Sequence, residues 1–266
     1  MMCKNLLEKI EETFPKEAAM SFDNVGLLCG RYDKEVKKVF ISLDVSMKVI
    51  DEAVKWGADL LITHHPIIMR NPIERVTNED YIGKRLIKLI QNDISYYAIH
   101  TNHDALSLSD LMANLMGLVD CELLIPNENP GLILKLGRDI SIGRIGKLPN
   151  AISLKECCEI VKDKFNLSDV RVFGNLDKEI NTVVVSPGSG KSAVVPAIQA
   201  GADVLIAGDI LHHDGLEAGD SGLSIIDAGH YGTEHLFIED MKNLLLKLNL
   251  DLDIKTMDIE HPCKIV

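Results

Sequence analysis

Histidine and acidic residues occur in four short motifs along the chain. The motifs are His64-His65-Pro66, His100-Thr101-Asn102-His103-Asp104, Gly208-Asp209-Ile210-Leu211-His212-His213 and His230-Tyr231-Gly232-Thr233-Glu234. In the second and fourth motifs a carboxylate follows a histidine by four residues. Imidazole nitrogens and carboxylate oxygens are suitable ligands for zinc, iron, manganese or nickel. The four motifs therefore direct the search for function toward a metal site.

The pair His64-His65 favours two ions rather than one. Neighbouring residues of a strand point to opposite faces, but Pro66 ends the regular ladder immediately afterwards, so both imidazoles can face one cleft. A carboxylate can then bridge two cations through its two oxygens. We predict a dinuclear metal centre whose ligands are His64, His65, Asp104, His230 and Glu234. Two divalent ions would lower the pKa of bound water to near neutrality and favour an anionic substrate.

A structural role for these histidines is the alternative interpretation. An isolated histidine at the end of a strand is more often a structural or surface group than a ligand. Here, however, seven of the nine histidines lie in the four motifs, which favours metal binding.

Three further segments allow more than one interpretation. The polar turn that begins at Asp23-Asn24 either caps a loop or closes over the cleft. Asp44 either caps a helix or accepts a hydrogen bond from a ligand imidazole. The glycine-rich segment 186–192 lacks the first glycine of a P-loop, because Val185 occupies that position, although its backbone amides could still bind an anion weakly.

An internal repeat underlies these motifs. Gly57-Ala58-Asp59-Leu60-Leu61-Ile62-Thr63 and Gly201-Ala202-Asp203-Val204-Leu205-Ile206-Ala207 are nearly identical and lie 144 positions apart. The histidines at positions 100 and 230 lie 130 positions apart, so elements between the copies differ in length. We predict two intertwined, duplicated αβ repeats, residues 1–126 and 127–266, with a turn-rich seam at 126–131.

Hydrophobic patterning predicts alternating helices and strands in both halves. Helices are expected at 4–13, 47–55, 81–91, 108–116, 154–165, 192–200 and 234–247, and strands at 39–43, 60–63, 94–99, 170–173, 182–186, 204–207, 224–227 and 253–257. Segments 132–136 and 141–145 are expected to form a short antiparallel pair. The fold class is therefore α/β, with mostly parallel or mixed sheets in three-layer packing. Ligands of such sheets bind beyond the carboxyl ends of the strands, where the four motifs lie.

Composition excludes several function classes. A net charge of −12 opposes binding to nucleic acids, which basic surfaces recognise. No apolar run reaches the ~18 residues of a membrane helix, and the first residues lack the pattern of a secretory signal. The six cysteines show no C-x-x-C spacing and are expected to be free thiols. We expect a cytoplasmic protein without a membrane partner.

The four motifs together resemble the NIF-three-like family, whose members are often named GTP cyclohydrolase 1 type 2. The resemblance covers essentially the whole chain from Asp23 onward. It implies a toroidal homohexamer and two divalent ions per subunit, with Asp104 as the bridging ligand. It also places His100 near the centre as a proton carrier, and His212 with His213 on the facing wall.

Two positions depart from the family. Members commonly carry Leu at the position of His103 and Glu at the position of Asp209. His103 is then either an additional ligand or a residue that points away, and the shorter Asp209 reaches a substrate through water.

The resemblance favours a metal-dependent hydrolase that acts on a small anionic, nucleotide-like substrate, with GTP cyclohydrolase chemistry as one form. His100 or His212 would carry the proton. The alternatives are a metal (iron) carrier or chaperone, and a regulatory interaction ring whose metals are structural.

Overall fold

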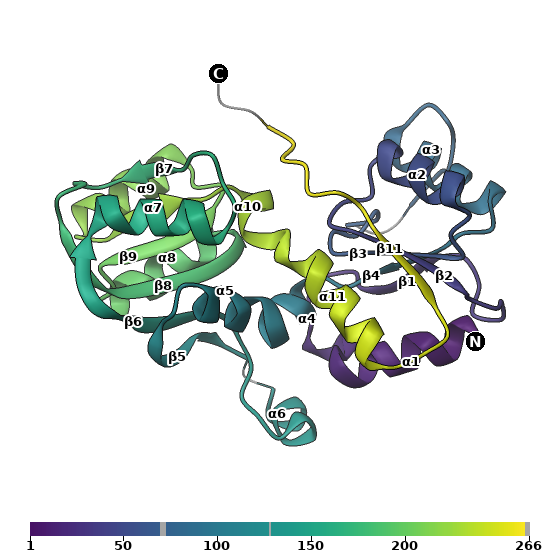
Figure 1. Ribbon diagram of the computed structural model, residues 1–266, viewed down its shortest axis with the longest axis horizontal. Helices are drawn as coiled ribbons and strands as arrows, with labels where there is room; N and C mark the ends of the chain where they lie inside the picture. Colours follow the sequence, from purple (N-terminus) through teal and green to yellow (C-terminus); the bar gives the residue numbers. More distant parts are fainter. Residues whose placement is uncertain (70–72, 128, 264–266) are drawn as a thin grey trace. The chain divides into compact units, whose positions relative to one another are not determined.

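The chain folds into two compact α/β units (Figure 1). The structure, a computed structural model, describes residues 1–69, 73–127 and 129–263. The first unit contains Met1–His103 and Phe237–Ile259, and the second contains Asp104–Leu236 and the residues from Glu260 onward. The predicted repeat boundary at 126/127 concerns duplication of the sequence and stays a prediction. Glu128, in the predicted seam, lies outside the described residues.

The first unit is built on a mixed five-stranded sheet. Its elements are α1 (Cys3–Thr13), η1 (Lys16–Ala18), β1 (Gly26–Cys29), β2 (Lys38–Ser42), α2 (Met47–Trp56), β3 (Leu60–Thr63), α3 (Tyr81–Gln91), β4 (Ser95–Ala98), α4 (Thr101–His103), most of α11 (Leu236–Lys247) and β11 (Asp253–Thr256). The strand order is β1-β4-β3-β2-β11. All neighbouring strands are parallel except β1, which pairs antiparallel with β4.

Helices cover both faces of this sheet. On one face, Val49 and Ile50 of α2 and Leu86 of α3 pack in a buried cluster with Phe40 and Leu61 of the sheet. Helices α1 and α11 lie on the opposite face (Figure 1). This arrangement confirms the predicted three-layer α/β packing in the first unit.

The second unit has a mixed six-stranded sheet. Its elements are η2 (Asp104–Leu108), α5 (Ser109–Leu115), β5 (Val119–Pro126), α6 (Pro130–Leu136), β6 (Ser141–Ser153), α7 (Leu154–Lys164), β7 (Arg171–Phe173), β8 (Glu179–Ser189), α8 (Lys191–Gln199), β9 (Val204–Gly208), α9 (His212–Asp220), β10 (Ser224–Asp227) and α10 (His230–Glu234). The strand order is β5-β6-β8-β9-β10-β7, and β8, β9 and β10 run parallel. Residues of α5 and α7 pack in one buried cluster and residues of α8 and α9 in another.

The two units share a four-stranded motif. Its order is β1-β4-β3-β2 in the first unit and β7-β10-β9-β8 in the second, and in each the first strand is antiparallel to the other three. The histidine and acidic motifs follow β3 and β4 in the first unit and β9 and β10 in the second. Both units therefore bring them to the carboxyl edge of the parallel strands.

Equivalent hydrogen bonds support the duplication. Asp59 Oδ2 accepts from the backbone amides of Lys37 and Lys38, both at 2.9 Å. Asp203 Oδ2, 144 positions later, accepts from the amides of Asn181 and Thr182 at 2.9 and 2.8 Å. In each copy the aspartate of the Gly-Ala-Asp sequence thus fixes the start of the neighbouring strand.

The prediction of an antiparallel pair between 132–136 and 141–145 is wrong. Residues Pro130–Leu136 form α6, because Asn129 accepts hydrogen bonds from the amides of Gly131 and Leu132, and proline is favoured in a first helical turn. The segment 141–145 belongs to β6, which pairs with β5. Strands β1 and β5 were not predicted, since neither shows a regular hydrophobic pattern.

Two expectations from composition can be compared with the structure. All six cysteines are free thiols. Among the described residues, no helix is long and apolar enough to cross a membrane.

Candidate metal centre

Three imidazoles of the first unit lie at the ends of neighbouring strands. One ring nitrogen each from His64, His65 and His100 can be chosen so that all three lie within 4.8 Å of one another. The amides of both His64 and His65 donate to the Leu43 carbonyl, at 3.1 and 3.0 Å, so the chain leaves the regular ladder at this point. The ring centroids of His64 and His65 are 5.1 Å apart. Both imidazoles thus face the same side, as the position of Pro66 predicted.

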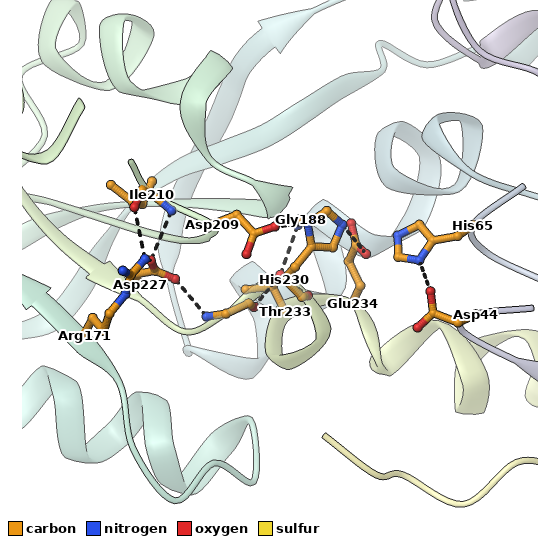
Figure 2. Close-up of polar contacts among 11 residues, drawn as sticks. Asp44, His65, Arg171, Gly188, Asp209, Ile210, Asp227, His230, Thr233 and Glu234 are labelled. Atoms are coloured by element: carbon orange, nitrogen blue, oxygen red, sulfur yellow. Dashed lines mark hydrogen bonds and ion pairs between the residues drawn. The ribbon is translucent and has the colours of Figure 1, made fainter. Parts of the chain in front are cut away.

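Asp44 orients one of these imidazoles. Its Oδ1 lies 2.8 Å from His65 Nδ1 (Figure 2). Ser46, and not Asp44, caps α2 by accepting from the Val49 amide. Of the two interpretations of Asp44, the structure supports the acceptor. A carboxylate on Nδ1 fixes the ring and leaves Nε2 for a metal, an arrangement common among metal-binding histidines.

Asp23 orients His100 in the same way. Its Oδ1 lies 2.9 Å from His100 Nδ1, and its Oδ2 accepts from the Thr101 amide at 3.0 Å and from Thr101 Oγ1. Burial of the carboxylate raises its pKa, but the hydrogen bonds and charge of His100 and the bonds from Thr101 outweigh burial and lower the pKa of Asp23 to about 2. The polar turn at Asp23 is therefore a fixed partner of His100.

His103 and Asp104 adjoin the boundary between the units. His103 is fully buried, its Nε2 lies 2.8 Å from Asp240 Oδ2, and its ring packs against Phe14 and Phe237. Asp104, also buried, begins the π-helical turn η2. Single π-helical turns are frequent at functional sites. The sequence did not indicate this turn or the Asp240 partner of His103.

The second unit supplies a histidine held by two acids. His230 Nε2 lies 3.0 Å from Glu234 Oε2, and His230 Nδ1 lies 2.9 Å from Asp209 Oδ2 (Figure 2). Burial lowers the pKa of His230, but the hydrogen bonds and negative charges of Glu234 and Asp209 outweigh burial and raise it to about 9. Glu234 is almost completely buried. The carboxylates of Glu234 and Asp209 thus stabilise positive charge at His230.

Asp227 supports the loops that carry Asp209 and His230. Its Oδ2 accepts from the Ile210 amide at 3.1 Å and from Arg171, and its Oδ1 accepts from the Gly229 amide at 3.0 Å (Figure 2). Sequence reasoning assigned no role to Asp227. The only available signal was an acidic residue at the end of a buried strand.

The remaining predicted residues lie around the second sheet. His212 and His213 begin α9 and are exposed, with ring centroids 5.3 Å apart. In the glycine-rich segment, the Gly188 amide donates to Thr233 Oγ1 at 3.0 Å and is not available to an anion.

The first unit brings three imidazoles together, and the second places an imidazole beside two acids. His65 and His100 each hold a carboxylate on Nδ1, so Nε2 is the nitrogen of each ring that would meet a metal ion or a proton. His230 holds Asp209 on Nδ1 and Glu234 on Nε2. The nitrogen and oxygen donors suit zinc, iron, manganese or nickel. The arrangement can bind divalent ions and orient the ligands before an ion arrives.

The chain is similar to known proteins over nearly its whole length. A Methanocaldococcus jannaschii protein named GTP cyclohydrolase 1 type 2 homolog is 36% identical over 262 residues, which cover 97% of this chain and 100% of that protein. A homolog of the same name from Clostridium acetobutylicum is 35% identical over 233 residues, covering 87% of this chain and 84% of that protein.

Solved structures show the same fold. A Bacillus cereus protein related to NIF3 superposes with a TM-score of 0.90 at 24% identity, covering 100% of this chain and 99% of the other. Reduced HcgD from Methanocaldococcus jannaschii superposes with a TM-score of 0.81 at 35% identity, covering 97% and 98% of the two chains. A family model matches residues 1–262, and the chain belongs to the Duf34/NIF3 (NGG1p interacting factor 3) family.

Proposed function

We propose that the protein is a dinuclear metal-dependent hydrolase that acts on a small anionic, nucleotide-like substrate. The proposed ligands of two divalent ions are His64, His65, Asp104, His230 and Glu234. The ions would lower the pKa of water and stabilise negative charge on the substrate.

The observation that carries this proposal is the matched orientation of His65 and His230. Each imidazole holds a carboxylate on Nδ1, Asp44 at 2.8 Å and Asp209 at 2.9 Å. A buried acid beside His230, Glu234, completes the donor set of the second unit. Such carboxylate partners fix the tautomer and raise the basicity of ligand imidazoles.

Residues of the chain itself would handle the proton. His100 Nδ1 is held by Asp23, so Nε2 is the nitrogen that exchanges a proton with the substrate or with water. His212 is exposed and would act as an alternative carrier at the facing wall.

The substrate class rests on charge and on the relatives. A chain with a net charge of −12 needs local positive charge to bind an anion, and two divalent ions would provide it. Relatives at 35–36% identity carry the name GTP cyclohydrolase 1 type 2 homolog, which makes GTP the first substrate to test.

Metal analysis combined with turnover tests the proposal. We expect two divalent ions per chain by elemental analysis, and consumption of GTP or a related phosphoester by the metal-loaded protein. His100→Gln should retain both ions and lose turnover. Full metal occupancy without turnover of any nucleotide or phosphoester would reject the hydrolase. Ready loss of one ion to a mild chelator would then favour the carrier.

We also propose that the protein assembles as a homohexamer, as the family resemblance implies. Light scattering coupled to size exclusion should give six times the monomer mass of 29.4 kDa. A monomer or dimer at micromolar concentration would contradict the ring.

A further inference from the structure

Strand β8 bulges at the point where it approaches α10. Val185 pairs with Ile206 and Ser189 pairs with Gly208, so β8 uses four residue steps where β9 uses two. The extra residues lie in the segment Ser186-Pro187-Gly188. Such bulges commonly redirect the backbone beside functional sites.

The bulge brings the backbone of Gly188 against the side chain of Glu234. A Cβ atom added to Gly188 would lie 2.1 Å from Glu234 Oε1 and 3.2 Å from His230 Nε2. Any other residue at position 188 would therefore occupy the space of the Glu234 carboxylate. Glu234 has little room to move, because it is buried and its Oε2 lies 3.0 Å from His230 Nε2.

Thr233 holds Gly188 next to α10 by a hydrogen bond. Its Oγ1 accepts from the Gly188 amide at 3.0 Å and donates to the His230 carbonyl at 2.9 Å (Figure 2). Gly188 is thus bonded to α10 through Thr233 and lies against the Glu234 carboxylate.

We propose that Gly188 is a positioning residue that sets the place of the Glu234 carboxylate beside His230. The inference rests on the proposed metal-binding function of Glu234. Gly188 touches the ligand side chain and would not itself bind an ion. Its backbone fixes where a buried acid can present its oxygens.

The first unit uses the equivalent position differently. Asp44 lies 144 positions before Gly188, two residues after the equivalent strand β2 ends, and its carboxylate holds His65. In the first copy the strand end carries an acid, whereas in the second copy it leaves space for an acid that comes from α10.

Gly188→Ala tests the inference, with Gly201→Ala as its matched control. Both glycines have left-handed backbone, with φ of +60° and +70°, but a Cβ at Gly201 meets nothing within 4 Å. Both variants should lose thermal stability, because both place alanine in a strained conformation, and Gly188→Ala should lose more because its Cβ also displaces the Glu234 carboxylate. Only Gly188→Ala should weaken metal binding, by about 10- to 100-fold in titration calorimetry. Wild-type affinity in Gly188→Ala would overturn the proposal.

A double-mutant cycle tests whether Gly188 affects metal affinity through Glu234. If Gly188 acts through Glu234, Gly188→Ala should cause no further loss of metal affinity in a Glu234→Gln background. An equal loss in both backgrounds would overturn the proposal. Should Gly188→Ala not fold, Thr233→Val takes its place, because it removes the acceptor of the Gly188 amide, with Thr233→Ser as control. Metal affinity should fall in the valine variant alone, and unchanged affinity there would equally overturn the proposal.

Metal-free crystals separate this inference from the proposed function. Absence of metal binding by the wild type would reject the metal centre. In metal-free Gly188→Ala we still expect the distance from Glu234 Oε2 to His230 Nε2 to lengthen from 3.0 Å. An unchanged distance would reject the role of Gly188 alone.

Discussion

Replacing Asp23 with asparagine should destabilise the first unit in a pH-dependent manner. The Asp23 side chain has no solvent exposure and accepts hydrogen bonds from the amide and hydroxyl of Thr101 and faces His100 Nδ1. Asparagine keeps the size of the side chain but removes its charge. The charge-assisted part of these bonds is therefore lost while packing is preserved.

The magnitude follows from the pKa of Asp23. A decrease from the ordinary 3.8 to about 2 corresponds to about 2 kcal/mol of stability at pH 7. Because the folded pKa lies below the unfolded one, this contribution is complete above about pH 5 and is lost as the pH falls toward 2. At pH 3 the difference between wild type and Asp23→Asn should be about half of its value at pH 7.

Urea unfolding at pH 7 and at pH 3 measures the loss in free energy of unfolding at each pH. Asp33→Asn is the control, because the Asp33 side chain is 83% exposed and its replacement should change the free energy of unfolding by no more than about 0.5 kcal/mol. The reasoning fails if Asp23→Asn matches the control at pH 7. It fails equally if the loss is the same at both pH values.

Three further predictions concern the ligands, the repeat and a helix cap. Asp44→Asn and Asp209→Asn should each weaken metal binding by about 10- to 100-fold in calorimetry without a change in circular dichroism, since each releases an oriented imidazole; unchanged affinity would contradict the orienting role. Asp59→Ala and Asp203→Ala should each lower the free energy of unfolding by about 1–3 kcal/mol, because each leaves two backbone amides without their acceptor; a loss in only one copy would contradict the equivalence. Ser46→Ala should cost about 1 kcal/mol in urea unfolding by removing the cap of α2, whereas exposed Lys55→Ala should have little effect.

The sequence by itself determined most elements and the types of ligand. Aliphatic runs such as Leu60–Thr63 became buried strands at their predicted positions, because hydrophobic periodicity is a local property. The repeated Gly-Ala-Asp sequence indicated the duplication, and Pro66 indicated that His64 and His65 leave the ladder together. The predicted strand at 132–136 was wrong, because the cap at Asn129 begins a helix and outweighs the apolar pattern that follows it.

Only the tertiary structure decided which acid holds which imidazole. Asp23 and His100 lie 77 positions apart and meet where the loop before β1 reaches the end of β4. Gly188 meets Glu234 because β8 bulges next to β9. These contacts depend on strand order and on bulges, which arise from the packing of distant segments and leave no periodic signal in the chain.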